Sequence, residues 1–424
     1  MNTFYKVMTL CVIALFSFTA QAQTKDVLTL QDAIHFTLQH NPQLAGYEFR
    51  VKALAGEQQT AALKPQLRVT TELENIGGSG EFKGVDANEF TLSLSSIIEL
   101  GGQRDARLGL VTARQQQLES TQRVLTLDVL TQVTRQFTAI AASQEQLKLL
   151  QQTQQLAKEN LSLLEKQIHT GRTPEADFLR AKAALARALI NEQKARRELD
   201  SEHVKLSAFW ADTQPAFTQV KADLFSLPQA TDLQTLIKKL DTNPDLAVLG
   251  DQVHLREAEL RQAQAERKSN LEWNAGVRRL QVSDDSAFVL GLSMPLGSNA
   301  RASGAITTAQ AHRADAELAQ VNARIQLRAQ LINLHEKLQL TLAEINSLGS
   351  DVLPPLKQAM SAVNNGFSLG RYSYFELNLA HNELLSAQVA LIEAAAHAHL
   401  LNVDIERITG TGVVASTSDV KVLP

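Results

Sequence analysis

The chain has one cysteine in 424 residues, and it lies in an N-terminal segment with the pattern of a secretory signal. Within residues 1–22, a lysine near the start is followed by an apolar stretch, Val7 to Thr19, and by Ala20-Gln21-Ala22, a small-residue cleavage site. A membrane anchor is the alternative, but the apolar stretch is shorter than the roughly 20 residues that a spanning helix needs. With cleavage before Gln23, the mature chain would have no thiol, no disulfide and no cysteine to carry a lipid.

Other absences remove further classes of function. No segment beyond the signal has 18 consecutive apolar residues, so we expect no helical span of the inner membrane. The formal net charge is −4 and no basic cluster contains interleaved aromatics, so we expect no binding of nucleic acid. Aromatic residues make up only 5%, whereas Ala, Leu, Gln, Arg and Glu are abundant, which favours long packed helices over compact cores.

The residue patterns of enzymes, cofactor sites and metal sites are missing too. His335-Glu336 is not followed by the second histidine of a zinc-protease motif, and no phosphate-binding or nucleophile-elbow glycine pattern is present. His397 and His399 are two residues apart on an expected helix, so they cannot share a face. Met294 and Met360 are the only methionines of the mature chain, too few for a series of Cu(I) ligands. We expect no catalysis, no cofactor and no bound metal.

What the chain does contain is an internal duplication with a spacing of about 200 residues. The matching pairs are Asn41-Pro42 with Asn243-Pro244, Phe90–Ser95 with Phe288–Ser293, Gly101–Arg104 with Gly297–Arg301, and Gly171–Asp177 with Gly370–Glu376. This predicts a first repeat over residues 23–210, a linker over 211–230, a second repeat over 231–410 and a disordered tail over 411–424.

Each repeat contains two segments in which apolar and polar residues alternate, the pattern of strands. The four predicted strands cover about 66–76, 89–98, 270–280 and 287–296. Their length suits tilted strands crossing a bilayer, although each hairpin alone would also fit an ordinary half-buried sheet. The residues expected to face lipid are Leu92, Leu94, Trp273, Phe288 and Leu290.

Two very long helices follow each strand pair. The four helices are predicted at about 103–169, 174–209, 300–365 and 374–409. The first would be roughly 100 Å long at 1.5 Å per residue, far beyond a globular helix. Apolar residues near its end recur at alternating spacings of three and four, which predicts coiled-coil packing. Pro354-Pro355 must kink or break the third helix.

The predicted fold class is mainly α with a small β part. Four strands are too few to close a barrel, and an open strand edge cannot lie in lipid. Three protomers would give a 12-stranded β-barrel in the outer membrane, with the long antiparallel helices continuing it as an α-barrel. A soluble periplasmic coiled-coil scaffold or adaptor is the alternative, but it would not explain two matched hairpins of bilayer length.

The order of these elements, given twice, carries a family resemblance. The Asn-Pro starts, the Leu100-Gly-Gly and Leu296-Gly-Ser turns, and the glycine tips followed six residues later by an acid resemble the TolC-like outer-membrane efflux channels. More narrowly, the chain resembles the outer-membrane components of heavy-metal (CzcC-type) resistance pumps. The resemblance covers nearly all of residues 28–410. Many relatives carry a lipid on an N-terminal cysteine, which this chain lacks.

The resemblance implies a homotrimer in the outer membrane of a Gram-negative bacterium, with a long periplasmic portion. It implies a passive exit duct, for heavy-metal cations in this branch, that works with a periplasmic adaptor and an inner-membrane resistance-nodulation-division pump. The sequence itself does not identify the substrate.

The resemblance also suggests functional positions at the two helical reversals. Gly171, Arg172, Gly370 and Arg371 would form the tips that dock the adaptor. Asp177 and Glu376 would contribute acids to the periplasmic entrance. Ser373 and Glu376 also fit a capping box, so Glu376 has a structural alternative.

Overall fold

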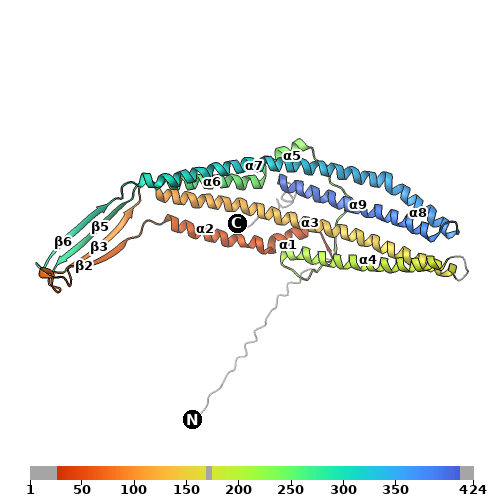
Figure 1. Cartoon of the computed structure of the whole chain (residues 1–424), viewed down its shortest axis with the longest axis horizontal. Coiled ribbons are helices and arrows are strands. Elements are labelled where there is room, and N and C mark those ends of the chain that lie inside the picture. Colours follow the sequence, from red (N-terminus) through yellow and green to blue (C-terminus); the bar gives the residue numbers. More distant parts are fainter. Residues whose placement is uncertain (1–25, 169–173, 411–424) are drawn as a thin grey trace, which may run out of the picture.

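The protein is a long, gently curved rod with a small β-sheet at one end (Figure 1). This computed structural model describes residues 26–168 and 174–410. The expected signal segment, the expected tail, and Gly171 and Arg172 lie outside the described residues.

Long helices make up the body of the rod. α3 (Gln103–Ile168) is its central element and packs against helices of both repeats. The others are α1 (Leu30–His40), α2 (Pro42–Ala62), α4 (Glu175–Ser207), α5 (Leu233–Lys239), α6 (Pro244–Ala265), α7 (Ser298–Ser347), α8 (Leu353–Ser368) and α9 (Tyr374–Thr409). Beside the sheet lie α2, α3, α6 and α7, whereas α3, α4, α8 and α9 reach the opposite end (Figure 1).

In each repeat, one asparagine side chain forms a tether: it caps one helix and donates a hydrogen bond to the end of another. The Asn41 Oδ1 accepts the Gln43 N–H at 2.9 Å and caps α2, while its Nδ2 donates to the Phe209 carbonyl at 2.8 Å. Asn243 caps α6 in the same way and donates to the Ile408 carbonyl. Proline fits the first helical position because no N–H is needed there. The repeated Asn-Pro motif therefore joins the start of one helix to the end of another in each repeat.

The sheet has the strand order β2-β3-β5-β6, and every pair is antiparallel. The strands are β2 (Arg68–Glu74), β3 (Glu89–Ile98), β5 (Leu271–Leu280) and β6 (Asp285–Ser293). Leu94 lies opposite Val69 and Ala275, and Ala275 lies opposite Leu290, so the register aligns the apolar residues of all four strands on one face.

The polar face of the sheet is crowded. A Cβ added at Gly276 would lie 2.6 Å from the Leu92 carbonyl oxygen, and one added at Gly291 would lie 2.2 Å from the Asn274 side chain. Glycine at these two positions permits a close approach of neighbouring strands, as on the inner side of a curved sheet.

The expected third long helix is two helices, because α7 ends at Ser347 and α8 begins at Leu353. A π-helical turn, η4 (Leu348–Val352), separates them. The physical reason is that Pro354 and Pro355 cannot donate backbone hydrogen bonds inside a helix, whereas the first turn of α8 tolerates them.

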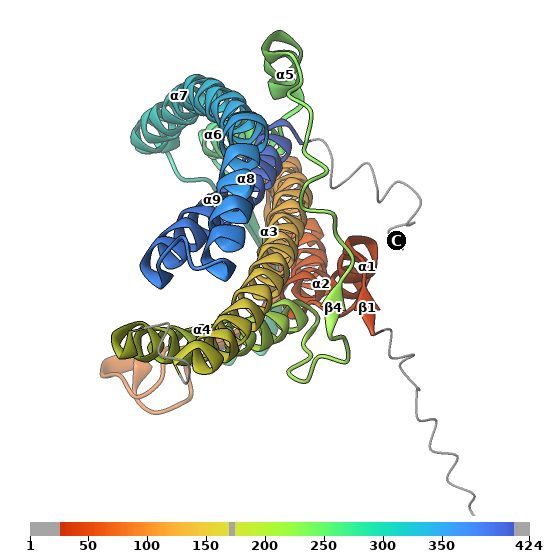
Figure 2. The ribbon, with the colours of Figure 1, turned by 90° about the vertical axis from the view of Figure 1, so that its right-hand side faces the viewer.

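The segment expected to link the repeats contains a short strand. β4 (Gln219–Val220) pairs in parallel with β1 (Val27–Leu28), and the segment between β4 and α5 then runs along one side of the helices (Figure 2). Two-residue strands leave no alternating pattern, so the sequence could not reveal them.

α9 is apolar enough, by length and composition, to cross a membrane, and is the one such helix among residues 26–168 and 174–410. Composition alone therefore does not exclude a helical span, contrary to the sequence-based expectation. Its packing gives another reason for the apolar residues, since Ala394, Ala398 and Leu401 belong to a core shared with α5 and α7.

We expect Asn243→Ala to lower the free energy of unfolding by about 2–4 kcal/mol, from a lost helix cap and an unpaired buried carbonyl. Asn243 is 1% exposed. Asn333→Ala, on an exposed position of α7, is the control and should change stability by no more than about 0.5 kcal/mol. Urea denaturation followed by circular dichroism measures both; equal losses would contradict the tether.

Candidate functional site

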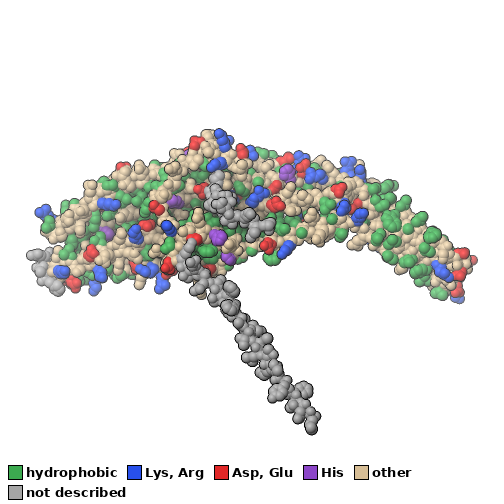
Figure 3. Space-filling model, turned by 180° about the vertical axis from the view of Figure 1, so that it is seen from behind, with side chains coloured by type: hydrophobic (Ala, Val, Ile, Leu, Met, Phe, Trp, Pro, Cys, Tyr) green, Lys and Arg blue, Asp and Glu red, His purple; other side chains and the backbone are tan. Residues whose placement is uncertain are grey.

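The apolar face of the sheet is one candidate functional surface. The strand register places Leu92, Leu94, Trp273, Phe288 and Leu290 on this face. Phe288 is 88% exposed and Leu290 81% exposed. Figure 3 shows a continuous apolar surface over this end of the rod. A contiguous apolar surface of this kind is typical of contact with a membrane or a partner.

The opposite face of the sheet is polar and organised by Arg278. Its guanidinium lies 2.9 Å from the Glu89 carboxylate and 3.1 Å from that of Glu74, and its Nε donates to the Thr91 hydroxyl at 3.0 Å. Three strands are thus tied together on this face. Within the described residues, β2 pairs only with β3, and β6 only with β5, so the outer edges of the sheet are open.

At the opposite end, a small core joins the two helical hairpins. Leu164 and Ala181, from α3 and α4, pack with Phe367, Tyr374 and Leu377, from α8 and α9. The end of the α3–α4 pair is therefore packed against the end of the α8–α9 pair.

The described reversal is tight. Gly370 has a φ of +74°, and its N–H donates to the Phe367 carbonyl at 3.0 Å, while the Arg371 N–H donates to the Gly366 carbonyl at 2.8 Å. A Cβ at Gly366 would lie 2.2 Å from the Tyr372 ring. Gly370 and Arg371 thus sit at a fixed, exposed tip.

The two acids near the reversals differ in their surroundings. Glu376 is exposed and accepts hydrogen bonds from the Ser373 N–H at 2.7 Å and hydroxyl at 2.9 Å, which completes a capping box and lowers the pKa of Glu376. Asp177 has a side chain only 14% exposed, and Arg180 lies 3.3 Å from its carboxylate. Glu376 therefore presents a negative charge to solvent, whereas the charge of Asp177 is compensated by its neighbour.

Exposed apolar side chains surround the same reversal, and sequence reasoning missed most of them. They are Leu369, Tyr372, Phe375 and Leu379. The spacing of Phe375 and Leu379, four residues apart at the start of a helix, was the available signal.

A half-buried cation joins the repeats midway along the rod. Arg407 of α9 donates to both carboxylate oxygens of Asp245 at 2.6 and 2.9 Å and to Asp128 of α3 at 2.5 Å. The hydrogen bonds to Asp245, then those to Asp128, raise the pKa of Arg407. Arg135 and Asp404 form a further ion pair between α3 and α9. The sequence alone did not identify these contacts, because the partners are more than 150 positions apart.

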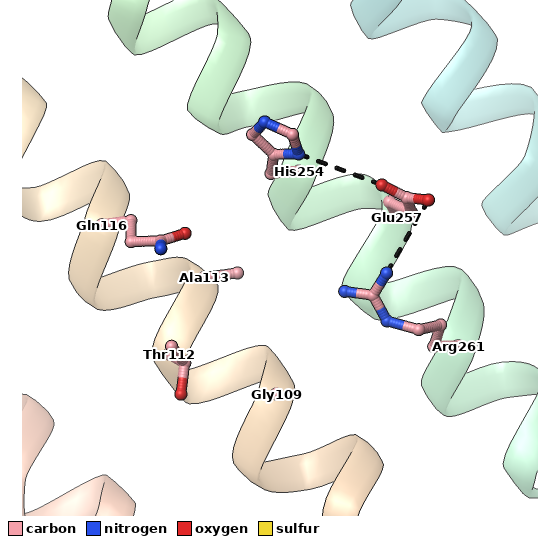
Figure 4. A pocket seen from close by; sticks show the side chains of 7 residues that line it. All are labelled: Gly109, Thr112, Ala113, Gln116, His254, Glu257 and Arg261. Atoms are coloured by element: carbon pink, nitrogen blue, oxygen red, sulfur yellow. Dashed lines mark ion pairs between the residues drawn. The ribbon is translucent and has the colours of Figure 1, made fainter.

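A groove of about 410 Å³ lies between α3 and α6 (Figure 4). Gly109, Thr112 and Ala113 give its α3 side small side chains, and Glu257 on α6 lies 3.7 Å from Arg261 and 3.9 Å from His254. Residues 26–168 and 174–410 contain no group of three or more His, Cys, Asp or Glu side chains that could hold a metal ion.

A rod of paired long helices that carries an open sheet, apolar on one face, is the protomer architecture of an outer-membrane channel. Residues 33–212 match the family described as outer membrane efflux protein. The chain is 24% identical over 385 residues, 90% of each chain, to the cobalt-zinc-cadmium resistance protein CzcC of Cupriavidus metallidurans. It is 25% identical over 240 residues to the nickel-cobalt-cadmium resistance protein NccC of Alcaligenes xylosoxydans xylosoxydans, which is 54% of this chain and 52% of that one.

Solved channel structures have the same fold. The outer-membrane channel OprN aligns with a TM-score of 0.74 at 17% identity, covering 91% of this chain and 90% of that one. VceC from Vibrio cholerae aligns with a TM-score of 0.72 at 18% identity, covering 91% and 96%.

The family match over residues 33–212, the homology to CzcC along 90% of the chain and the TolC-like fold together identify an outer-membrane efflux channel. The resemblance stated from the sequence is confirmed, and the soluble scaffold is excluded. Members of this family are efflux channels rather than enzymes, and its homologues are outer-membrane proteins with a periplasmic portion.

Proposed function

We propose that three copies close into one channel, with β2 of each protomer paired to β6 of the next. The observation that supports this is an open four-stranded sheet whose exposed face is apolar. Unpaired strand edges are costly in lipid, and a 12-stranded closed barrel leaves none. The polar face with Arg278 then lines the pore, and the helices continue it as a tunnel.

We propose that this channel is the exit duct of a tripartite efflux pump for divalent metal cations. The support is the alignment along 90% of the chain with CzcC, whose name assigns it to cobalt, zinc and cadmium resistance. We also propose that residues 1–22 are a secretory signal and that the helices lie in the periplasm. With that signal removed, no cysteine remains to carry a lipid, so we propose that the protein is not lipidated. The pump would be an inner-membrane transporter of the resistance-nodulation-division class.

We propose that the helical reversals dock the periplasmic adaptor. Family channels work with adaptor and pump proteins and form trimers. The tip formed by Gly370 and Arg371 is rigid and exposed at the end farthest from the sheet. Gly171 and Arg172 would form the equivalent tip of the first repeat.

We propose that Asp177 and Glu376 lie at the periplasmic entrance of the closed trimer. Threefold symmetry would turn each into a ring of three carboxylates, and such rings attract cations. The exposed Glu376 would contribute most of the charge, because Arg180 compensates that of Asp177.

The barrel model predicts different effects for arginine on the two faces of the sheet. Leu290→Arg should impair insertion by about 2–4 kcal/mol near the bilayer midplane. Asn274→Arg is the control, since Asn274 is exposed on the polar face at a similar depth. Outer-membrane fractionation and native mass spectrometry measure insertion and trimers. Equal tolerance of both substitutions, or only monomers for the wild type, would contradict the model.

The docking proposal predicts that Arg371→Glu removes tolerance to zinc, cobalt and cadmium while leaving the trimer yield normal. Arg328→Glu, at an exposed position on the body of α7, should retain tolerance. Growth of a deletion strain carrying each variant is the measurement. Full tolerance with Arg371→Glu would place docking elsewhere, and no restored tolerance by the wild type would reject metal export.

The entrance proposal predicts that Glu376→Gln lowers cation selectivity more than Asp177→Asn does. Glutamine can also complete a capping box, so the helix start should be preserved. Arg180→Gln should raise cation selectivity by releasing the charge of Asp177. Single-channel recording in planar bilayers measures all three. Unchanged selectivity in the Glu376→Gln, Asp177→Asn double variant would remove both acids from the entrance.

A further inference from the structure

The junction between the sheet and the helices is rich in positive charge. We define the collar as residues 59–67, 99–107, 262–270 and 294–301, which connect α2, α3, α6 and α7 to the strands. It contains six basic residues (Lys64, Arg104, Arg107, Arg267, Lys268 and Arg301) and three acidic ones (Glu99, Asp105 and Glu266). The whole chain has a formal charge of −4, so the positive excess is local.

The other end of the strands has the opposite charge balance. Residues 74–89 and 278–285 contain six acidic residues (Glu74, Glu81, Asp86, Glu89, Asp284 and Asp285) and three basic ones (Lys83, Arg278 and Arg279). Arg278 pairs with Glu74 and Glu89, so the remaining excess of acid comes from the loops. The sheet therefore separates a basic end from an acidic end.

Most collar cations are not neutralised within the protomer. Arg107 is paired with Glu99, and its Nη2 lies 3.1 Å from that carboxylate. In the described part of the chain, no ion pair involves Lys64, Arg104, Lys268 or Arg301, and all four are exposed. Arg104 donates to the Ala62 carbonyl at 2.7 Å, which fixes the side chain without cancelling its charge.

The same junction exposes apolar side chains beside these cations. Leu296 is 84% exposed, and Leu63 and Leu67 are 66% and 65% exposed. Trp273 lies on the apolar face at the collar end of β5. On the face shown in Figure 3, Lys and Arg side chains lie where the apolar surface of the strands gives way to the helices. Tryptophan, leucine and basic side chains together are typical of a membrane–water boundary.

We propose that the collar binds the phosphate groups of anionic glycerophospholipids in the periplasmic leaflet of the outer membrane. This inference rests on the proposed insertion of the strands. The long helices extend from the collar end of the sheet, so that end faces the periplasm. Among the described residues, each protomer presents five uncompensated cations there, because Arg267 is also exposed and donates only to the neutral Asn299 side chain. Basic residues near a bilayer surface contribute about 1 kcal/mol each to binding anionic lipid.

The test uses the intact protein, reconstituted into vesicles of phosphatidylethanolamine with a minor fraction of phosphatidylglycerol. The lipids that remain bound after mild detergent extraction are quantified by mass spectrometry. Wild type should retain phosphatidylglycerol in preference to phosphatidylethanolamine. The Lys64→Gln, Lys268→Gln, Arg301→Gln triple variant should lose this preference, by about fivefold for each charge removed. High salt should weaken it as well.

The matched control removes three exposed lysines from the helical body, in the Lys158→Gln, Lys182→Gln, Lys337→Gln variant. It has the same net charge as the collar variant and should keep the preference. Equal loss in both variants, or no preference in the wild type, would overturn the proposal. Retention of lipopolysaccharide but not phosphatidylglycerol in parallel vesicles would also overturn it, because it would place the collar against the other leaflet.

Trimer yield and single-channel conductance of the collar variant separate this proposal from the channel function. Both should equal the wild-type values. If the wild type failed to form conducting trimers, the channel proposal would fail. Conducting trimers without lipid preference would remove the collar proposal alone.

Discussion

The backbone hydrogen bonds of two strands determine how this protein can exist in a membrane. Among residues 26–168 and 174–410, β2 and β6 each have one partner strand, so each leaves a row of N–H and C=O groups unpaired there. In water these groups would be solvated, but lipid offers them no partner. The apolar face of the same sheet favours lipid over water. The strand edges need hydrogen-bond partners while this face needs lipid, and the proposed closed assembly would meet both needs. In the proposed trimer, closure would also arrange the long helices, the tips and the collar of three protomers around one axis.

In the helical part of the molecule, a few polar contacts connect elements that are far apart in the sequence. The side chains of Asn41 and Asn243 each join the start of one helix to the end of another within their repeat. Arg407 connects α9 to α3 and α6 through Asp128 and Asp245. These hydrogen bonds act together with the apolar clusters between the helices, such as the one that joins α5, α7 and α9.

The sequence predicted the features that have a period. Alternation identified the strand face with Leu92 and Leu290, and heptad spacing identified the long helices. It could not predict features that depend on tertiary contacts. The short β1–β4 pair needs two segments about 190 positions apart, and the contacts of Arg407 with Asp128 and Asp245 join residues more than 150 positions apart. The pairing of Asp177 with Arg180, three residues apart on α4, could have been predicted from the sequence but was missed. The prolines of α8 predicted an interruption, but only the structure shows that it takes the form of a π turn.

That π turn makes the two halves of the molecule mechanically unequal. α3 is one continuous helix from Gln103, beside the sheet, to Ile168 near the opposite end, so it resists bending along its whole length. The corresponding path through the second repeat has a flexure at Leu348–Val352, where the regular hydrogen-bond ladder changes. A sideways force on the tips would therefore bend the second repeat mainly at this π turn. α8 would then rotate about the turn while α3 and α4 kept their arrangement.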